Sequence, residues 1–474
     1  MKQIGIIASD STESTARVIV FEGKEKETSV EDLVLIKNMG GEEIIGVIRE
    51  GLGINEALKA GEYRPGVAYT KKGGVPSSSR EVFDFKIFSI GKIGDRLEQN
   101  LKVIAPRSEV YTFDRDENPM KYLSKGLEEV AYIGYYAGHK TWRIPVNVAF
   151  IPYHIGVFAS TGGGKSYLAR HVLIPLLREL KYDVIVFDWK GRDYSPYFEG
   201  NTIGLKDIAI DASVAADYLL DKMSFFGISS YRDSNALINA FKEYMEDLEW
   251  RNLGFEDFKA DLKSKVEKVL SEDESRYAKS YLRKLERSLR RLKEADFLEV
   301  CGRKESKDII AEAHEKHLLV INMVKAASPQ KLSIFLSIAK YLKERMEGDE
   351  NVNLALLIDE APQYAPFQPK GLQEDTTEII KDLCALGRSY GLVIILLSQG
   401  IAGDIGINAA VRRNLNTQFF GSIHPLDIEE ASKWLTPYGV KIEFLLRLPP
   451  GHFYFAGKMN PAPMPLLMSF ELKG

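Results

Sequence analysis

A short apolar run, a cluster of glycines and an amphipathic stretch follow one another in this chain and constrain its fold more than any other feature. The segment GVFASTGGGKSYLARHV spans residues 156–172, and residues 159–166 match the pattern GxxxxGK[ST] except that Ala159 replaces the first glycine. Small residues let consecutive backbone N–H groups turn inward, and the helix that follows adds its positive N-terminal end. This order predicts a strand, a phosphate-binding loop and a helix.

The residue types in this loop predict how it would hold ATP and Mg²⁺. Lys165 is expected to reach the β- and γ-phosphates, and the Ser166 hydroxyl to hold Mg²⁺. The other predicted contacts to ATP are Ser160, Thr161, Gly162, Gly163, Gly164 and Tyr167. The alternative is a glycine turn that binds nothing.

A second motif lies far along the chain, in NLALLIDEAPQYAP. Four apolar residues, 355–358, lead into Asp359 and Glu360, as expected for a buried strand that ends in a magnesium ligand and a catalytic glutamate. We expect Asp359 to hold Mg²⁺ and Glu360 to orient or deprotonate the attacking water. An acidic pair after a strand also occurs as a simple helix N-cap, but a phosphate loop in the same chain favours the hydrolytic interpretation.

Two further segments place polar residues beside apolar strands. GRSYGLVIILLSQ carries Arg388 before such a strand and Gln399 after it, at the edge where ligands bind in open α/β folds. Gln399 is expected to sense the γ-phosphate and Arg388 to stabilise charge on it. The alternatives are a helix-capping Arg388 and a structural Gln399. FDWKGRDY places Asp188, Lys190 and Arg192 at another edge, near the nucleotide or a neighbouring subunit, or in a turn stabilised by Asp188.

The pattern of apolar segments predicts two domains. Residues 1–150 contain short β-branched runs separated by turn residues, which is typical of a small β-barrel or sandwich. In residues 151–474, continuous apolar strands alternate with helices, which predicts an α/β core with a parallel sheet. A helical insertion interrupts this core at about residues 207–306. The Pro-, Gly- and Ser-rich segment 63–80 is expected to be an exposed loop.

Composition excludes several other classes of protein. Of the 474 residues, 45% are hydrophobic and 27% charged, which is typical of globular proteins, and a net charge of −4 argues against a wholly basic nucleic-acid coat protein. Cys301 and Cys384 cannot build a disulfide framework, which favours a reducing cytoplasm. The longest apolar stretches, such as residues 391–398, fall short of the roughly 20 residues that span a bilayer. We therefore expect a cytoplasmic chain without membrane insertion.

Taken in order, these features resemble the HerA family of hexameric DNA translocases, relatives of FtsK and of VirB4- and TraG-type conjugation ATPases. The N-terminal HAS barrel of that family resembles IGIIASDSTESTARVIV, and its phosphate loop, with alanine in first position, resembles HIGVFASTGGGKS. Its second strand resembles VIVFDWKG, and its acidic strand end resembles LLIDEAPQY. Its arginine and glutamine segment resembles GRSYGLVIILLSQ. The resemblance implies a RecA-like P-loop ATPase core and a homo-hexamer that moves double-stranded DNA. A NurA-type nuclease would be its partner in DNA end resection and recombinational repair.

The chain departs from that family in two places, and in one of them DWKG (residues 188–191) leans toward the DPKG of TraG-type coupling proteins. The family often has an arginine just before the strand that leads to the phosphate loop, whereas Tyr153 and His154 stand here. Arg143, Arg412 and Arg413 are the alternatives for a residue that acts on the ATP of a neighbouring subunit. A conjugation-, secretion- or packaging-type DNA-pumping ATPase uses the same core and remains an alternative function. A P-loop regulator or small-molecule kinase is another.

Cationic segments outside the motifs have two interpretations. An expected helix in the insertion has an apolar face and a basic face, which is either solvated or in contact with nucleic acid or a neighbouring subunit. The apolar face consists of Tyr281, Leu285, Leu289 and Leu292, and the basic face of Lys284, Arg287, Arg290, Arg291 and Lys293. The segments around Arg232 and Lys370 are either channel loops that contact DNA or ordinary surface loops.

Overall fold

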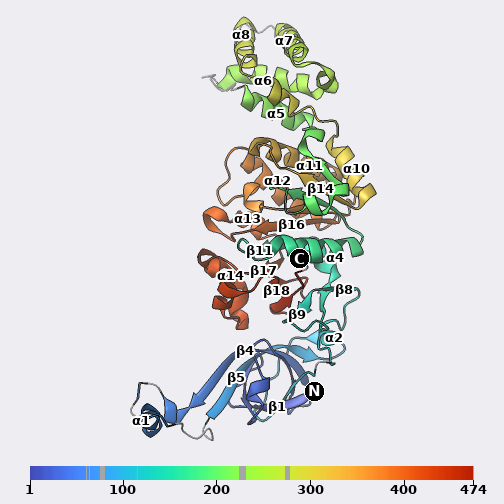
Figure 1. Ribbon diagram of the computed structural model, residues 1–474. Coiled ribbons are helices and arrows are strands. Elements are labelled where there is room, and N and C mark those ends of the chain that lie inside the picture. Colours follow the sequence, from blue (N-terminus) through green and yellow to red (C-terminus); the bar gives the residue numbers. More distant parts are fainter. Residues whose placement is uncertain are drawn as a thin grey trace. The chain divides into compact units, whose positions relative to one another are not determined.

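The computed structural model describes residues 1–59, 61–62, 64–74, 81–114, 116–223, 231–272 and 278–472, with the backbone alone for 231–236 (Figure 1). The chain forms two compact units. The first, which we call the barrel unit, comprises Met1–Leu176, Gln399–Ile401 and Leu415–Gly474. The second, the central unit, comprises Leu177–Ser398 and Ala402–Asn414.

Six antiparallel strands close into a barrel within the barrel unit. In order around the barrel they are β2 (Thr15–Val20), β1 (Lys2–Ile7), β7 (Glu109–Thr112), β3 (Leu33–Lys37), β4 (Glu43–Asn55) and β5 (Glu81–Ile93). Pairing of Val18 with Phe85 joins β2 to β5 and closes the ring, and β6 (Leu97–Glu98) extends β5. Val18 is buried while its neighbour Ile19 is exposed, as expected when alternate side chains of a strand face the core. The predicted small β-barrel is confirmed.

The segment 63–80 differs from its prediction where the structure describes it. Residues 65–71 form helix α1 (Pro65–Lys71) instead of an exposed loop. Pro65 is at the first helical position, where its fixed φ suits a helix and its missing N–H is not needed. Prolines and glycines were therefore a misleading signal here, because one of them starts a helix. Residues 75–80 lie outside the described residues.

A second group of strands in the barrel unit leads to the glycine cluster. In pairing order these are β11 (Ile155–Phe158), β17 (Thr417–Phe420), β18 (His452–Gly457), β19 (Leu466–Ser469) and β9 (Tyr135–Tyr136). β11 and β17 are parallel, and the other pairs are antiparallel. The same unit contains β8 (Val130–Ile133) paired with β10 (Ile144–Asn147), and helices α2 (Met120–Leu123) and α14 (Ile428–Leu435). After β11 come α3 (Lys165–Leu168), a π-helical turn (Ala169–Leu173) and α4 (Ile174–Glu179).

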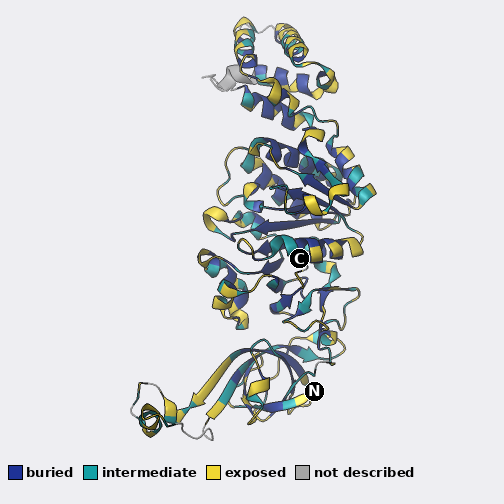
Figure 2. Cartoon of the chain, in the orientation of Figure 1, coloured by how far each residue is buried: buried dark blue, intermediate teal, exposed yellow. Residues whose placement is uncertain are grey.

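Parallel strands form the core of the central unit. Their order is β13 (Thr202–Gly204), β14 (Leu318–Asn322), β12 (Asp183–Asp188), β15 (Leu354–Ile358) and β16 (Leu392–Ser398). Every residue of β15 and β16 is buried, as expected for strands covered on both faces (Figure 2). The helices of the unit outside the insertion include α10 (Ser306–Lys316), α11 (Ser328–Glu347), α12 (Leu372–Gly387) and α13 (Ala409–Arg412). The predicted α/β class is confirmed.

The insertion in the central unit is helical, as predicted. Its α-helices are α5 (Ala212–Lys222), α6 (Tyr231–Glu246), α7 (Phe255–Glu272), α8 (Ala278–Leu289) and α9 (Glu294–Leu298). The predicted apolar face of α8 and the residues after it is buried, with Tyr281 and Leu285 at 4% and 0% exposure. The predicted basic residues Arg287, Arg290, Arg291 and Lys293 are exposed, and Lys284 is half-buried. Within the described parts of the chain, helices long enough to span a bilayer lack the necessary apolar character.

Candidate functional site

The backbone of the glycine cluster forms a tight turn between β11 and α3. Gly162 and Gly164 have φ angles of +80° and +95°, which residues with a side chain rarely adopt. The Gly163 N–H donates a hydrogen bond of 3.1 Å to the Ser160 carbonyl, and helix α3 begins at the next residue but one, Lys165. Glycine is therefore required at two positions of the turn for conformational reasons alone.

Ala159 occupies space that two glycines leave open. A Cβ atom added at Gly163 would lie 2.9 Å from the Ala159 Cβ, and one added at Gly421 would also lie 2.9 Å from it. Both distances are shorter than carbon atoms tolerate. The alanine that departs from the GxxxxGK[ST] pattern is thus accommodated because Gly163 and Gly421 have no side chains.

The loop holds the side chain that would bind phosphate. Lys165 Nζ donates to the Ala159 carbonyl at 2.6 Å and to the Ser160 carbonyl at 3.3 Å, so the ammonium lies against the turn. Ser166 and Tyr167 follow in the first turn of α3, and both are half-buried. The Arg170 guanidinium lies 4.9 Å from the centroid of the Tyr167 ring. These positions place a cation and a hydroxyl beside the glycine turn, as the sequence predicts.

Gln399 is brought to the same loop. It follows the last residue of β16, and its Oε1 accepts a hydrogen bond of 2.9 Å from the Thr161 hydroxyl. Thr161 and Gln399 belong to two distant motifs that the sequence predicts for one site, and the structure brings them into contact. This contact lies within the barrel unit, which includes residues 399–401.

An acidic cluster forms where two strands of the central unit end. β12 ends at Asp188, and Asp359 follows β15, its parallel neighbour. Carboxylate oxygens of Asp188, Asp193 and Asp359 lie within 4.8 Å of one another. Asp193 is not among the residues predicted from the sequence, although its place shortly after Asp188 in FDWKGRDY was the available signal.

Asp188 organises the turn that follows it. One carboxylate oxygen accepts the N–H of Gly191 at 2.9 Å. The other accepts the N–H groups of Tyr194 and Ser195 at 3.1 and 2.9 Å and the Ser195 hydroxyl at 2.8 Å. The turn-stabilising role that the sequence left open for Asp188 is therefore present in the structure.

Asp359 has the properties of a ligand for a hard cation. It is 2% exposed, and its Oδ2 has no hydrogen-bond partner in the part of the chain that the structure describes. Burial, and then the negative charges of Glu360 and Asp193, raise the pKa of Asp359 to about 7. An unpartnered carboxylate oxygen beside two further carboxylates is a donor set that suits Mg²⁺. The residues present fit the predicted metal.

Glu360 has an unusual backbone and a cationic partner. Its φ is +51°, in the left-handed region, and it precedes the 3₁₀ turn Ala361–Gln363. Its carboxylate forms an ion pair with Lys190. The sequence placed Lys190 at a sheet edge, and the structure shows which residue it contacts.

Comparison with known proteins finds one matching family model. Residues 131–342 match the family model described as Helicase HerA, central domain. These residues form a HerA-type central domain. No curated protein sequence matches the chain.

Solved structures resemble the chain over most of its length. The bacterial conjugative coupling protein TrwB in its unbound monoclinic form has a TM-score of 0.50 and 16% identity, over 75% of this chain and 92% of TrwB. TrwB with the GTP analogue GDPNP has a TM-score of 0.50 and 16% identity, over 76% and 93%. VirB4 of Thermoanaerobacter pseudethanolicus has a TM-score of 0.49 and 15% identity, over 73% and 97%. At such identities the likeness to TrwB shows the P-loop ATPase fold alone.

Arg388 belongs to the central unit, whereas the phosphate loop belongs to the barrel unit. Arg388 directly follows α12, and it is exposed. Asp359 and Glu360 belong to the same unit, whereas Lys165 and Gln399 belong to the barrel unit.

Lys458 lies beside Tyr153, the residue that stands where the HerA family often has an arginine. Lys458 Nζ lies 4.6 Å from the centroid of the Tyr153 ring and 5.5 Å from that of Phe150. Lys458 is exposed. Of the alternatives named from the sequence, Arg143 and Arg413 are exposed and Arg412 is half-buried. Sequence reasoning missed Lys458 because only strand pairing brings it near Tyr153.

The structure describes the two segments predicted as channel loops or surface loops, around Lys370 and Arg232, to different extents. Lys370 is exposed and lies just before α12, so it is available for contact. Residues 224–230 and the side chain of Arg232 lie outside the described residues.

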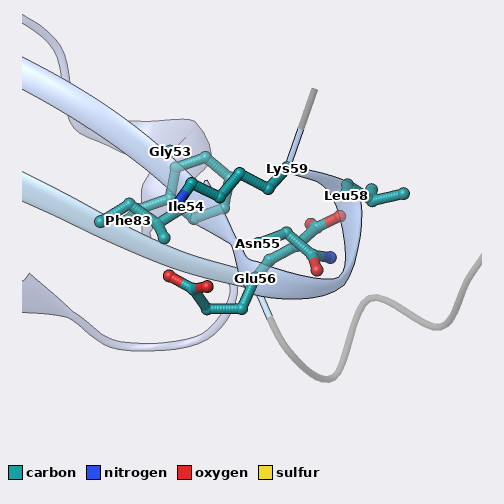
Figure 3. Close-up of a pocket in the computed structure, with 8 residues that line it drawn as sticks. Gly53, Ile54, Asn55, Glu56, Leu58, Lys59 and Phe83 are labelled. Atoms are coloured by element: carbon teal, nitrogen blue, oxygen red, sulfur yellow. The ribbon is translucent and has the colours of Figure 1, made fainter. Parts of the chain in front are cut away.

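A cavity in the barrel unit does not have the features of a phosphate site. It has a volume of about 500 Å³ and lies at the turn after β4 (Figure 3). Its lining consists of Gly53, Ile54, Asn55, Glu56, Leu58, Lys59, Glu81 and Phe83. It contains two carboxylates, and its one lysine, Lys59, forms an ion pair with Glu62 at 2.8 Å. The charged side chains of its lining are therefore mainly acidic, which does not favour binding of an anion.

Proposed function

We propose that this HerA-type chain hydrolyses ATP with Mg²⁺ and uses the energy to move double-stranded DNA. The observation that carries the proposal is the buried, unpartnered oxygen of Asp359 among other carboxylates, in a chain that also has a phosphate loop with its lysine in place. TrwB structures with bound GTP and ATP analogues support nucleotide binding by the same fold.

Each residue then has a defined role. The backbone of residues 160–164, with Lys165, would hold the phosphates, and Tyr167 would lie beside the nucleotide. Ser166 and Asp359 would hold Mg²⁺, which supplies charge neutralisation to the phosphates. Glu360 would orient or deprotonate the attacking water.

Two residues would report on the nucleotide. Gln399, through its bond to Thr161, would sense the γ-phosphate. Arg388, exposed on the central unit, would stabilise phosphate charge. Lys458 joins Arg143, Arg412 and Arg413 as a cation that could act on the ATP of a neighbouring subunit.

The match to the HerA central-domain model supports a proposal for the larger assembly. We propose a cytoplasmic homo-hexamer that acts as a DNA translocase or helicase in end resection and recombinational repair, with a NurA-type nuclease as partner. The likeness to TrwB, a conjugative coupling protein, favours a DNA-pumping ATPase of the conjugation or packaging type as the second candidate.

An ATPase assay with and without linear duplex DNA tests the proposal. We expect DNA to stimulate the wild type, Lys165→Ala to lose nucleotide binding, and Glu360→Gln to bind ATP but hydrolyse it at least about 100-fold more slowly. Normal hydrolysis by Glu360→Gln together with no stimulation by DNA would refute the motor and the role of Glu360. Mass photometry tests the ring separately, and a strict monomer in the presence of ATP and DNA would contradict it.

A further inference from the structure

Lys190 and Glu360 meet because the strands that precede them are neighbours. β12 and β15 are parallel, with Phe187 opposite Ile358, so the chain leaves both strands at the same edge of the sheet. Lys190 Nζ donates a hydrogen bond to Glu360 Oε1, and the two groups form an ion pair. The side chain of Glu360 is 17% exposed and that of Lys190 is 35% exposed. The carboxylate is thus the more enclosed partner.

The backbone that carries Lys190 is fixed by the turn after β12. Asp188 accepts the N–H of Gly191, directly after Lys190, and that of Ser195. Gly191 has a φ of +67°, and an added Cβ would lie 2.3 Å from Asn322 Oδ1. The turn therefore has little freedom, and it sets the direction from which Lys190 approaches.

The backbone that carries Glu360 is also fixed. Its left-handed φ of +51° is costly for a residue with a side chain, and such strain is characteristic of functional positions. Its carbonyl accepts the N–H of Gln363 at 2.8 Å, which stabilises this conformation. The side-chain torsions of Glu360 are then the main freedom left to its carboxylate.

Lys190 lies among the carboxylates at this edge of the sheet. The negative charges of Glu360, Asp359 and Asp193 all act on its ammonium. Burial lowers the pKa of Lys190, but the hydrogen bond and charge of Glu360 and the charge of Asp359 outweigh it and raise the pKa overall. The ammonium therefore stays charged at neutral pH. Lys331 donates to the carbonyl of Trp189, the residue before Lys190, at 2.9 Å.

We propose that Lys190 is a positioning residue that holds the Glu360 carboxylate in the orientation required for ATP hydrolysis. This inference rests on the proposed function. A group that orients water must be placed accurately, since a displacement of about 1 Å can cost on the order of 100-fold in rate. Lys190 acts through Glu360, so it should influence turnover more than nucleotide binding.

Steady-state ATPase assays and ATP-analogue titrations on four proteins test this role. They are the wild type, Lys190→Met, Lys190→Arg and the control Lys381→Met, which breaks the exposed ion pair of Lys381 with Glu378 in α12. For Lys190→Met we expect kcat to fall about 10-fold or more while analogue affinity changes less than about 2-fold. Lys190→Arg should recover part of kcat, and Lys381→Met should match the wild type.

A double-mutant cycle separates positioning from general damage. Lys190→Met should have almost no further effect on turnover or on Tm when Glu360 is already Gln, because the partner is then gone. Unchanged or raised kcat in Lys190→Met, or an additive loss in the cycle, would overturn the inference. Failure of this inference can be told apart from failure of the proposed function. If the wild type hydrolyses ATP and Glu360→Gln does not, the proposed function stands whatever Lys190→Met does. An inactive wild type would overturn both.

Discussion

The Thr161 hydroxyl donates a hydrogen bond of 2.9 Å to Gln399 Oε1 and so connects the phosphate loop to the residue after β16. Thr161 is exposed, and Gln399 is half-buried. A side chain that follows a buried strand and bonds to the loop is well placed to respond when phosphate enters the loop.

Removal of the Gln399 amide should uncouple binding from turnover. We expect Gln399→Ala to lower kcat about 10-fold or more and to leave ATP-analogue affinity within about 3-fold of the wild type. Thr161→Val, which removes only the donor, should have the same effect in weaker form. ATPase assays and calorimetric titration measure both quantities. Equal loss of affinity and turnover would assign Gln399 to ground-state binding instead.

A methyl group at position 163 should disrupt the phosphate loop. In Gly163→Ala the new Cβ would lie 2.9 Å from that of Ala159, so the turn must shift. We expect ATP affinity to fall about 10-fold or more in a titration with a fluorescent analogue. The double variant Ala159→Gly/Gly163→Ala removes the opposing methyl and should recover part of the loss. If ATP affinity does not recover, another contact of the new Cβ causes the loss, such as that with the Ser160 carbonyl oxygen at 3.1 Å.

Asp359 should make the metal-free protein less stable as the pH rises. Burial raises its pKa to about 7, whereas an unfolded carboxyl titrates near about 4. Between these values the unfolded chain has released a proton that the folded chain retains. The free energy of unfolding therefore falls as pH rises from about 4 to about 7, by at most about 4 kcal/mol, and levels off above.

Thermal unfolding in EDTA tests whether the free energy of unfolding falls as pH rises. Asp359→Asn carries no titratable group and should have a higher Tm than the wild type at pH 8. The difference should shrink when the same proteins are compared at pH 5.5. A constant difference, or a lower Tm for the variant at pH 8, would contradict the raised pKa.

The buried Arg49 should be a major stabilising residue of the barrel unit. It is 1% exposed, pairs with Glu31 and donates to the Pro465 carbonyl. Glu31 also accepts the hydroxyl of Tyr454 at 2.9 Å. Arg49→Met would leave the Glu31 charge buried without its cation, which costs about 3 to 5 kcal/mol.

Chemical denaturation measures that cost. The double variant Arg49→Met/Glu31→Gln removes both charges and should be more stable than Arg49→Met alone. If the double variant is the less stable of the two, the hydrogen bonds of Glu31 outweigh its charge.

The basic face of α8 should contribute to DNA binding, if the proposed function holds. Arg283 and Arg287 are exposed and four residues apart in α8, which places them on one side of the helix, and the exposed Arg290 directly follows the helix. We expect Arg287→Glu/Arg290→Glu to weaken binding of linear duplex DNA in fluorescence anisotropy. The slope of log K against log salt should fall by about 2, because each phosphate contact contributes about 0.9.

A matched variant separates local contact from net charge. Lys381→Glu/Lys433→Glu makes the same charge change at exposed ion pairs on other helices. It should leave DNA affinity and salt slope near those of the wild type. Equal loss in both double variants would show that the α8 face is only solvated.

The helices, the strands and the motifs were predictable from the order of the amino acids alone. The periodicity of apolar residues depends on local chain geometry, so it predicted the barrel strands, the buried parallel strands and the helices of the insertion. The loop around Lys165 and the pair Asp359 and Glu360 are contiguous in sequence and were visible there. The helix at Pro65 was missed because proline both ends and begins helices.

The contacts between residues that are distant in sequence depend on the tertiary structure. The contact of Thr161 with Gln399, the ion pair of Lys190 with Glu360 and the place of Asp193 in the acidic cluster all depend on strand order. Pairing of β2 with β5 likewise turned a set of strands into a closed barrel. Strand order is set by packing over the whole chain, whereas a sequence pattern records only near neighbours, so these relationships could not be derived from the sequence.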